Sequence, residues 1–171
     1  MKRSALVATH LPLLVRVFDK SEGDVLEIGT GYYSTLILRW LCAITDRKLY
    51  SYESKRKWYD KIKRKNKEDE NFEIFYTPDF SKADFDKRHW GMIFIDHSPN
   101  NKRHLEIERL ANKCDYMVIH DTTPFNPKHT HIPVDYQYED IWHLFKYRYD
   151  YTKIVPWTSV VSNFKELDDI E

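Results

Sequence analysis

A turn containing two glycines is the first feature of the sequence whose residue types could do chemistry. It reads Gly29-Thr30-Gly31 and lies between an apolar run at 24–28 and a segment with helical spacing at 34–44. Glycines at such a turn let backbone amides approach a ligand, and the following helix presents its N-terminus to that ligand. Glycines alone are equally typical of a plain strand–turn–helix corner, so a second feature must decide.

That second feature is Glu53, which ends the next apolar segment 22 residues after Gly31. An acid about 20 residues beyond a glycine turn is the usual partner of a ribose diol. The turn and the carboxylate together favour a nucleoside-binding site. Ser34 replaces the third glycine of the dinucleotide fingerprint, which disfavours a nicotinamide cofactor. The sequence also has no G-x-x-x-x-G-K-[ST] motif, which excludes P-loop NTPases at motif level.

Polar side chains follow the later predicted strands as well, at the points where those strands end. They occur in Thr77-Pro78-Asp79, Asp96-His97 and His120-Asp121-Thr122. The carboxyl ends of parallel strands meet at one edge of a sheet, and ligands bind at that edge. We therefore expect these side chains to surround one site.

The elements that must position these residues alternate between strand and helix patterns. Strands are predicted at 24–28, 48–53, 72–76, 91–95 and 116–119, and helices at 5–18, 34–44, 55–71 and 102–113. After a loop at 121–138, the pattern predicts a helix at 140–147 and a strand pair at 150–155 and 158–164. This order predicts a Rossmann-like α/β fold over residues 1–171, a single domain with a mostly parallel sheet, helices on both faces and an antiparallel terminal strand pair.

Composition limits the partners that the chain could have. The formal net charge is zero, with 27 basic and 27 acidic side chains, so bulk electrostatic binding of nucleic acid is not indicated. The basic segment 55–67 contains Trp58 and Tyr59, and we interpret it as a surface helix whose aromatic face packs on the sheet. We expect a cytoplasmic protein for three reasons. The two cysteines are far apart, no apolar run is long enough to span a bilayer, and the N-terminal segment does not read as a signal peptide.

The segment V-L-E-I-G-T-G-Y-Y-S-T resembles the first motif of the class I S-adenosylmethionine (SAM) methyltransferases. The resemblance implies that Glu27, Gly29 and Gly31 surround the methionine end and ribose of SAM, with Glu53 on the ribose hydroxyls and residues 78–80 beside the adenine. Tyr33 replaces the third glycine usual in that family. The residues expected to contact the cofactor are Glu27, Gly29, Gly31, Tyr32, Ser34, Glu53, Asp79, Phe80, Asp96 and His97.

A narrower resemblance lies in M-I-F-I-D-H-S and Y-M-V-I-H-D-T-T, which are similar to segments of the metal-assisted O-methyltransferases of the catechol and sugar type. It implies that Asp96, Asp121 and Thr122 hold Mg²⁺, although Thr122 is a poorer ligand than the Asn or Asp often found there. Alternatively, His120 acts as a general base without a metal. We therefore predict Asp96, His120 and Asp121 as catalytic residues.

These observations predict methyl transfer from SAM to a hydroxyl of a glycan or another small hydroxylated acceptor, by a chain that could form a homo-oligomer. An RNA methyltransferase using the 55–67 face is one alternative. A non-catalytic cofactor-binding or interaction module is another. His129-Thr130-His131 could form a lid over the substrate or an exposed loop.

Overall fold

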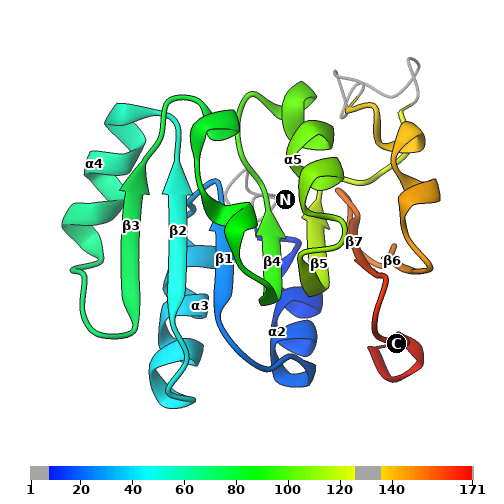
Figure 1. The fold of residues 1–171 in the computed structure, drawn as a ribbon, viewed down its shortest axis with the longest axis horizontal. Helices are drawn as coiled ribbons and strands as arrows, with labels where there is room; N and C mark the ends of the chain where they lie inside the picture. The colour runs from blue at the N-terminus through cyan, green and yellow to red at the C-terminus, as the bar shows by residue number, and fades with distance from the viewer. Residues whose placement is uncertain (1–7, 126–135, 171) are drawn as a thin grey trace.

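A computed structural model describes residues 8–125 and 136–170 and contains a seven-stranded sheet with the order β3-β2-β1-β4-β5-β7-β6 (Figure 1). The strands are β1 (Val25–Ile28), β2 (Leu49–Glu53), β3 (Phe72–Tyr76), β4 (Trp90–Ile95), β5 (Cys114–His120), β6 (Tyr147–Tyr151) and β7 (Thr158–Ser162). The predicted Rossmann-like class is confirmed.

Strand register brings the carboxyl ends of the central strands to one edge. Ile28 at the end of β1 is level with Tyr52 in β2 on one side and with Ile95 in β4 on the other. Strands β1 to β5 run parallel, whereas β7 is antiparallel to both β5 and β6. The antiparallel terminal pair is therefore also confirmed, and every polar strand end discussed above lies at the same edge.

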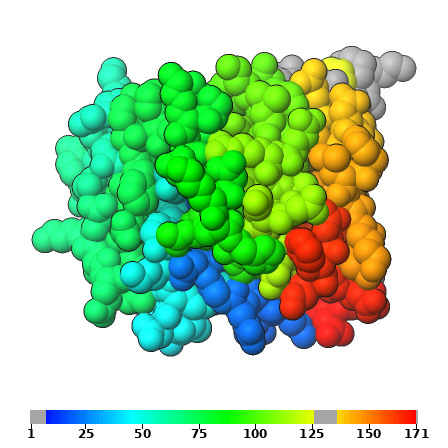
Figure 2. Space-filling view, in the orientation of Figure 1, coloured from blue at the N-terminus to red at the C-terminus, as the bar shows by residue number. Residues whose placement is uncertain are grey.

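Side chains alternate along the central strands, such as β1 and β4, between two buried faces. One face packs on helices α2 (Leu11–Lys20), α3 (Ser34–Ile44) and α4 (Arg56–Lys65). The other face packs on helix α5 (Arg103–Leu110) and on the short 3₁₀ turns η1 (Phe80–Lys82) and η2 (Phe85–Lys87). Figure 2 shows the η1–η2 segment and α5 covering the middle of this second face. The sheet is thus buried on both sides, as its apolar strands require.

Helix boundaries differ from the predicted ones in three places, while α3 spans the predicted residues 34–44. Helix α2 begins at Leu11, with Pro12 in the first turn where proline fits, and ends at Lys20 instead of residue 18; residues 5–7 of the predicted helix lie outside the described residues. Helix α4 ends at Lys65 instead of residue 71. Helix α5 covers 103–110 of the predicted 102–113.

The helix predicted at 140–147 is wrong. The chain there forms two 3₁₀ turns, η4 (Tyr138–Asp140) and η5 (Trp142–Leu144), and then enters β6 at Tyr147. Pairing of the aromatic-rich segment 147–151 with β7 outweighs the local helical pattern. His129 and His131 lie outside the described residues. Within the described ranges, no helix has the length and apolar character to cross a bilayer.

Candidate functional site

The glycine turn brings the end of β1 against the end of β4. Gly29 has a φ of 91°, and a Cβ on this residue would lie 2.4 Å from the Cα of His97. No other residue fits that approach, since the conflicting atoms belong to the backbone. The need for glycine at position 29 is therefore explained by strand packing before any ligand is considered.

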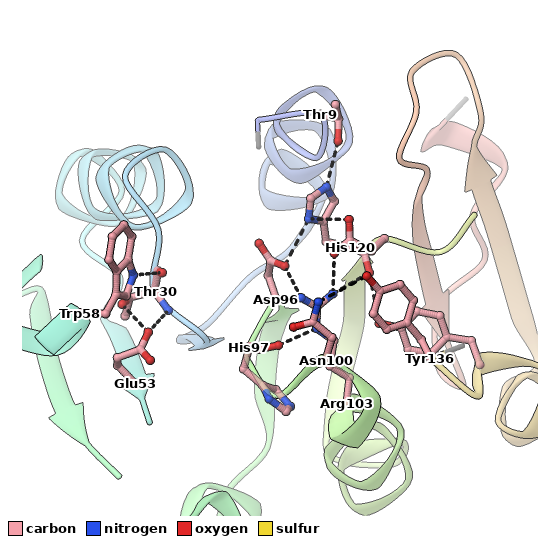
Figure 3. A network of polar contacts seen from close by, with 12 residues as sticks. Thr9, Thr30, Glu53, Trp58, Asp96, His97, Asn100, Arg103, His120 and Tyr136 are labelled. Atoms are coloured by element: carbon pink, nitrogen blue, oxygen red, sulfur yellow. Dashed lines mark hydrogen bonds and ion pairs between the residues drawn. The ribbon is translucent and has the colours of Figure 1, made fainter. Parts of the chain in front are cut away.

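The Glu53 carboxylate lies beside the same turn and is almost completely buried. It accepts hydrogen bonds from the backbone N–H of Thr30 at 3.1 Å, from the Thr30 hydroxyl at 2.9 Å and from the N–H of Lys55 at 2.8 Å (Figure 3). These bonds fix the carboxylate but use three of its roughly four acceptor positions. One position remains for a hydroxyl donor on a ligand.

Trp58 closes this part of the site from helix α4. Its indole N–H donates to the Thr30 carbonyl at 2.6 Å, and its ring packs edge-to-face on Tyr32 at 4.8 Å between centroids. The aromatic face of the basic helix therefore packs inward, as predicted. What the sequence did not reveal is that Trp58 also lines a cavity.

That cavity, named here the Glu53 cavity, has a volume of about 190 Å³. Its walls come from the ends of β1, β2 and β4 and from helix α4: Gly29, Thr30, Glu53, Lys55, Trp58, Asp96, His97 and Ser98. The glycine turn and the carboxylate predicted to hold a nucleoside are thus brought together.

The residues predicted to lie beside adenine line a second cavity of about 360 Å³, which shares His97 with the Glu53 cavity. Phe80 packs on the His97 ring at 4.7 Å between centroids. Asp79 begins the η1 turn, where it accepts bonds from the Ser81 N–H and hydroxyl, which hold the pKa of its carboxyl below the usual value. Asp79 and Phe80 therefore both line the cavity that meets the Glu53 cavity at His97.

Glu27 does not lie where the sequence predicts. It is fully buried beneath the turn and lines none of these cavities. Its carboxylate accepts bonds from the hydroxyls of Thr35 at 2.9 Å and Ser51 at 2.6 Å, and Thr35 in turn accepts from the Gly31 N–H at 3.0 Å. Burial raises the pKa of Glu27 to about 7. Glu27 therefore supports the turn from below, and its contact with the cofactor stays a prediction.

A third cavity of about 320 Å³, named here the His10 cavity, adjoins the Glu53 cavity. Three residues, Thr30, Trp58 and Asp96, line both. The other walls are His10, Gly31, Tyr32, Tyr33 and Ser34, so that the predicted residues Gly31, Tyr32 and Ser34 face this cavity and not the Glu53 cavity.

Arg103, in the first turn of α5, organises the polar ends of β4 and β5. Its guanidinium pairs with Asp96 at 2.7 Å and with Asp121 at 3.0 Å, and it also donates to the carbonyls of His97 and His120 (Figure 3). Only 3% of the side chain is exposed. The sequence analysis missed Arg103. A cation in the first turn of a helix opposes the helix dipole, and that signal could have identified it.

The predicted magnesium site does not fit these residues. The Arg103 guanidinium bridges the carboxylates of Asp96 and Asp121. The hydroxyl of the third predicted ligand, Thr122, is buried and accepts a hydrogen bond from Ser159 at 2.7 Å. An internal cation therefore takes the position between the two carboxylates where the sequence predicts Mg²⁺.

His120 is held between a hydroxyl and a carboxylate. Its Nε2 lies 2.9 Å from the Thr9 hydroxyl, and its Nδ1 lies 3.2 Å from Asp96 and 3.6 Å from Asp121. Burial alone would lower the pKa of His120, but the Asp96 carboxylate raises it above the usual value. The pKa of Asp96 would likewise rise on burial, yet His120 and Arg103 hold it well below its usual range.

His10, which was not among the site residues predicted from the sequence, lies next to this cluster. Its ring meets the His120 ring at 4.8 Å between centroids in a T-shaped arrangement and leans on Phe94. It is 1% exposed, and neither ring nitrogen has a hydrogen-bond partner within residues 8–125 and 136–170. Burial, with a contribution from the charge of His120, lowers the pKa of His10 to about 3. The ring is therefore neutral near pH 7.

Comparison with solved structures adds independent information about the fold. An O-methyltransferase family protein from Burkholderia thailandensis superposes with a TM-score of 0.64 at 11% identity, over 94% of this chain. The O-methyltransferase TomG from Streptomyces achromogenes, in complex with SAM, gives 0.60 at 14% identity over 93%. The Podospora anserina methyltransferase PaMTH1, bound to S-adenosylhomocysteine (SAH), superposes with a TM-score of 0.64 at 11% identity, over 90% of this chain. The chain has the fold of the class I methyltransferases.

The matched region is smaller than these proteins. The chain spans 57% of the length of the Burkholderia protein, 80% of TomG and 76% of PaMTH1. No protein-family model matches the sequence, and no curated protein shows significant similarity to it.

Proposed function

We propose that residues 1–171 form one domain that transfers a methyl group from SAM to a hydroxyl oxygen. The observation that carries this proposal is that the Glu53 cavity and the His10 cavity adjoin at Thr30, Trp58 and Asp96. One cavity has the residues for a nucleoside, and the other has the polar cluster for an acceptor. With the sulfur of SAM at the boundary between the two cavities, its methyl group would lie close to an acceptor hydroxyl beside Asp96.

In this proposal one ribose hydroxyl donates to Glu53, and the adenine extends toward Phe80 and His97. The buried carboxylate has one acceptor position left, which fits one hydroxyl of the ribose diol. The methionine end turns into the His10 cavity along Gly31 and Tyr32. That TomG was solved with SAM and PaMTH1 with SAH supports the choice of cofactor.

When bound, SAM supplies a methyl group on a positively charged sulfur, so that an acceptor oxygen forms the new carbon–oxygen bond as the carbon–sulfur bond breaks. Residues of the chain must then orient the acceptor and take up its hydroxyl proton. Asp96 lines the His10 cavity, and the Nδ1 of His120 lies 3.2 Å from Asp96 and 3.6 Å from Asp121; these three residues are the groups that we assign to this task.

A further cavity of about 260 Å³ supports a hydroxylated acceptor such as a glycan. It begins at Thr122, next to Asp121, and its walls include the stacked rings of Tyr136 and Tyr138 and the carboxyl groups of Glu139 and Asp140. Aromatic faces cover the apolar side of a ring, and carboxylates accept bonds from hydroxyls.

The test is transfer of radiolabelled methyl from SAM to a panel of glycans, catechols and RNAs. Label recovered as a methyl ether on a hydroxylated acceptor supports the proposal. Label in RNA would favour the alternative that uses the basic helix. Binding of SAH without transfer to any acceptor would favour a non-catalytic module. Glu53→Gln serves as the variant in which transfer at low SAM concentration must fall.

A further inference from the structure

A cluster of three metal-ligating side chains stands at the inner end of the His10 cavity. His10, Asp96 and His120 each offer one ligand atom, and these atoms lie within 4.8 Å of one another. They come from the turn before α2, the end of β4 and the end of β5, so that three separate elements converge on one point.

The ring nitrogens of this cluster lack partners to an unusual degree. Among the described residues, neither nitrogen of His10 nor the Nδ1 of His120 has a hydrogen-bond partner, although Asp96 lies 3.2 Å from the latter, and all three atoms are buried. Buried polar atoms are normally satisfied, and each exception needs an explanation. An ion accepting lone pairs from both rings would satisfy two of these three atoms together.

The surroundings of His120 also suit a metal ligand. The Thr9 hydroxyl lies 2.9 Å from Nε2 and so fixes the ring with Nδ1 toward Asp96. A partner on the second ring nitrogen is the usual arrangement for a histidine that binds a metal. Asp96 pairs with Arg103 and His120 through one oxygen, Oδ1, and its other oxygen makes none of these contacts.

We propose that His10, Asp96 and His120 bind one divalent cation of the zinc class, with an open position toward the His10 cavity. Two imidazoles and one carboxylate favour Zn²⁺, Co²⁺ or Fe²⁺ over Mg²⁺, which prefers oxygen ligands. Ligand distances near 2.0–2.2 Å require the three groups to approach by roughly 1 Å when the ion binds.

The charge balance permits this ion beside Arg103. Asp96 and Asp121 carry two negative charges against the single positive charge of Arg103. An ion with three protein ligands keeps a position for an oxygen, and His10 and Asp96 both line the cavity that we assign to the acceptor. In the proposed methyl transfer the ion would lower the pKa of an acceptor hydroxyl, but binding of the ion does not depend on that function.

The test is a titration of the tag-free, EDTA-treated protein with Co²⁺, followed by visible absorption and calorimetry. We expect saturable binding of one ion per chain, displacement of Co²⁺ by Zn²⁺ and no displacement by Mg²⁺. His10→Phe keeps the ring packing on Phe94 and Asp96→Asn keeps the side-chain size, so both should fold and lose at least 100-fold in affinity. His143→Ala, at an exposed histidine, should bind as the unmodified protein does.

Absence of saturable binding to the unmodified protein would overturn the proposal, as would unchanged affinity in His10→Phe. Near-ultraviolet circular dichroism of each variant shows whether its fold is intact. SAH binding measured on the same samples keeps the two proposals distinguishable. Metal binding without SAH binding would support this metal site and refute the cofactor assignment. SAH binding without metal binding would support the cofactor assignment and refute the metal site.

Discussion

Glu27→Gln is expected to stabilise the protein in a manner that depends on pH. Burial raises the pKa of Glu27 from 4.5 to about 7, so between these values the folded protein holds a proton that the unfolded chain has released. Stability must then fall as pH rises through this window, by about 1.4 kcal/mol per pH unit and about 3 kcal/mol in all. Glutamine has no proton to lose, and the Thr35 and Ser51 hydroxyls can accept from its amide.

The assay is urea denaturation of both proteins from pH 5 to pH 8, in buffer with EDTA. The difference between the two free energies of unfolding is the informative quantity. His10, whose pKa is lowered to about 3, makes stability rise with pH between that value and 6.5 and so masks Glu27 in the unmodified protein alone. We expect the free energy of unfolding of the variant, relative to that of the unmodified protein, to increase by about 3 kcal/mol from pH 5 to pH 8. Parallel curves would refute the placement of Glu27 as a buried, poorly hydrated carboxyl.

Three further outcomes are expected. Glu53→Gln should weaken SAH binding by about 5- to 150-fold in calorimetry, the cost of about 1–3 kcal/mol for a lost buried hydrogen bond; unchanged affinity would remove Glu53 from the ribose site. Asp121→Asn should lower kcat by on the order of 100-fold, because the variant lacks the carboxylate that we assign to the acceptor. SAH affinity should be nearly unchanged, because Asn tolerates the φ of 61° at this position and the fold is kept; undiminished turnover would exclude Asp121 from the reaction. Gly29→Ala should lose on the order of 3 kcal/mol in urea denaturation through its contact with His97. Gly31→Ala, which meets only the Ser34 side chain, should lose less, and equal losses would contradict the packing explanation.

The strands of the parallel part of the sheet could be predicted from the sequence because their signals are local. Apolar runs such as 91–95 and the alternation of strand and helix patterns specify a parallel sheet without any knowledge of long-range contacts. The conformation of 140–147 could not be predicted in this way, because Tyr147 pairs with β7 and Asn163 bonds to the backbone of Leu144 and Lys146, long-range contacts that no local pattern encodes.

For the site, the sequence predicted which strand ends carry polar residues but not how these residues pair. Glu53 and Gly29 do line one cavity. The role of Arg103 depends on the direction in which α5 leaves the sheet, because only the fold brings its guanidinium to Asp96 and Asp121. His10 could not be assigned to the site from the sequence, because it lies within the helix predicted at 5–18 and only the fold brings it to His120.

A crystal structure of the protein with SAH tests the central claim most directly. We predict ribose hydroxyls within hydrogen-bonding distance of Glu53, the adenine beside Phe80, and the sulfur at the boundary between the Glu53 and His10 cavities, near Asp96. SAH bound elsewhere on the molecule, or with its ribose away from Glu53, would contradict the proposal of methyl transfer at this edge of the sheet.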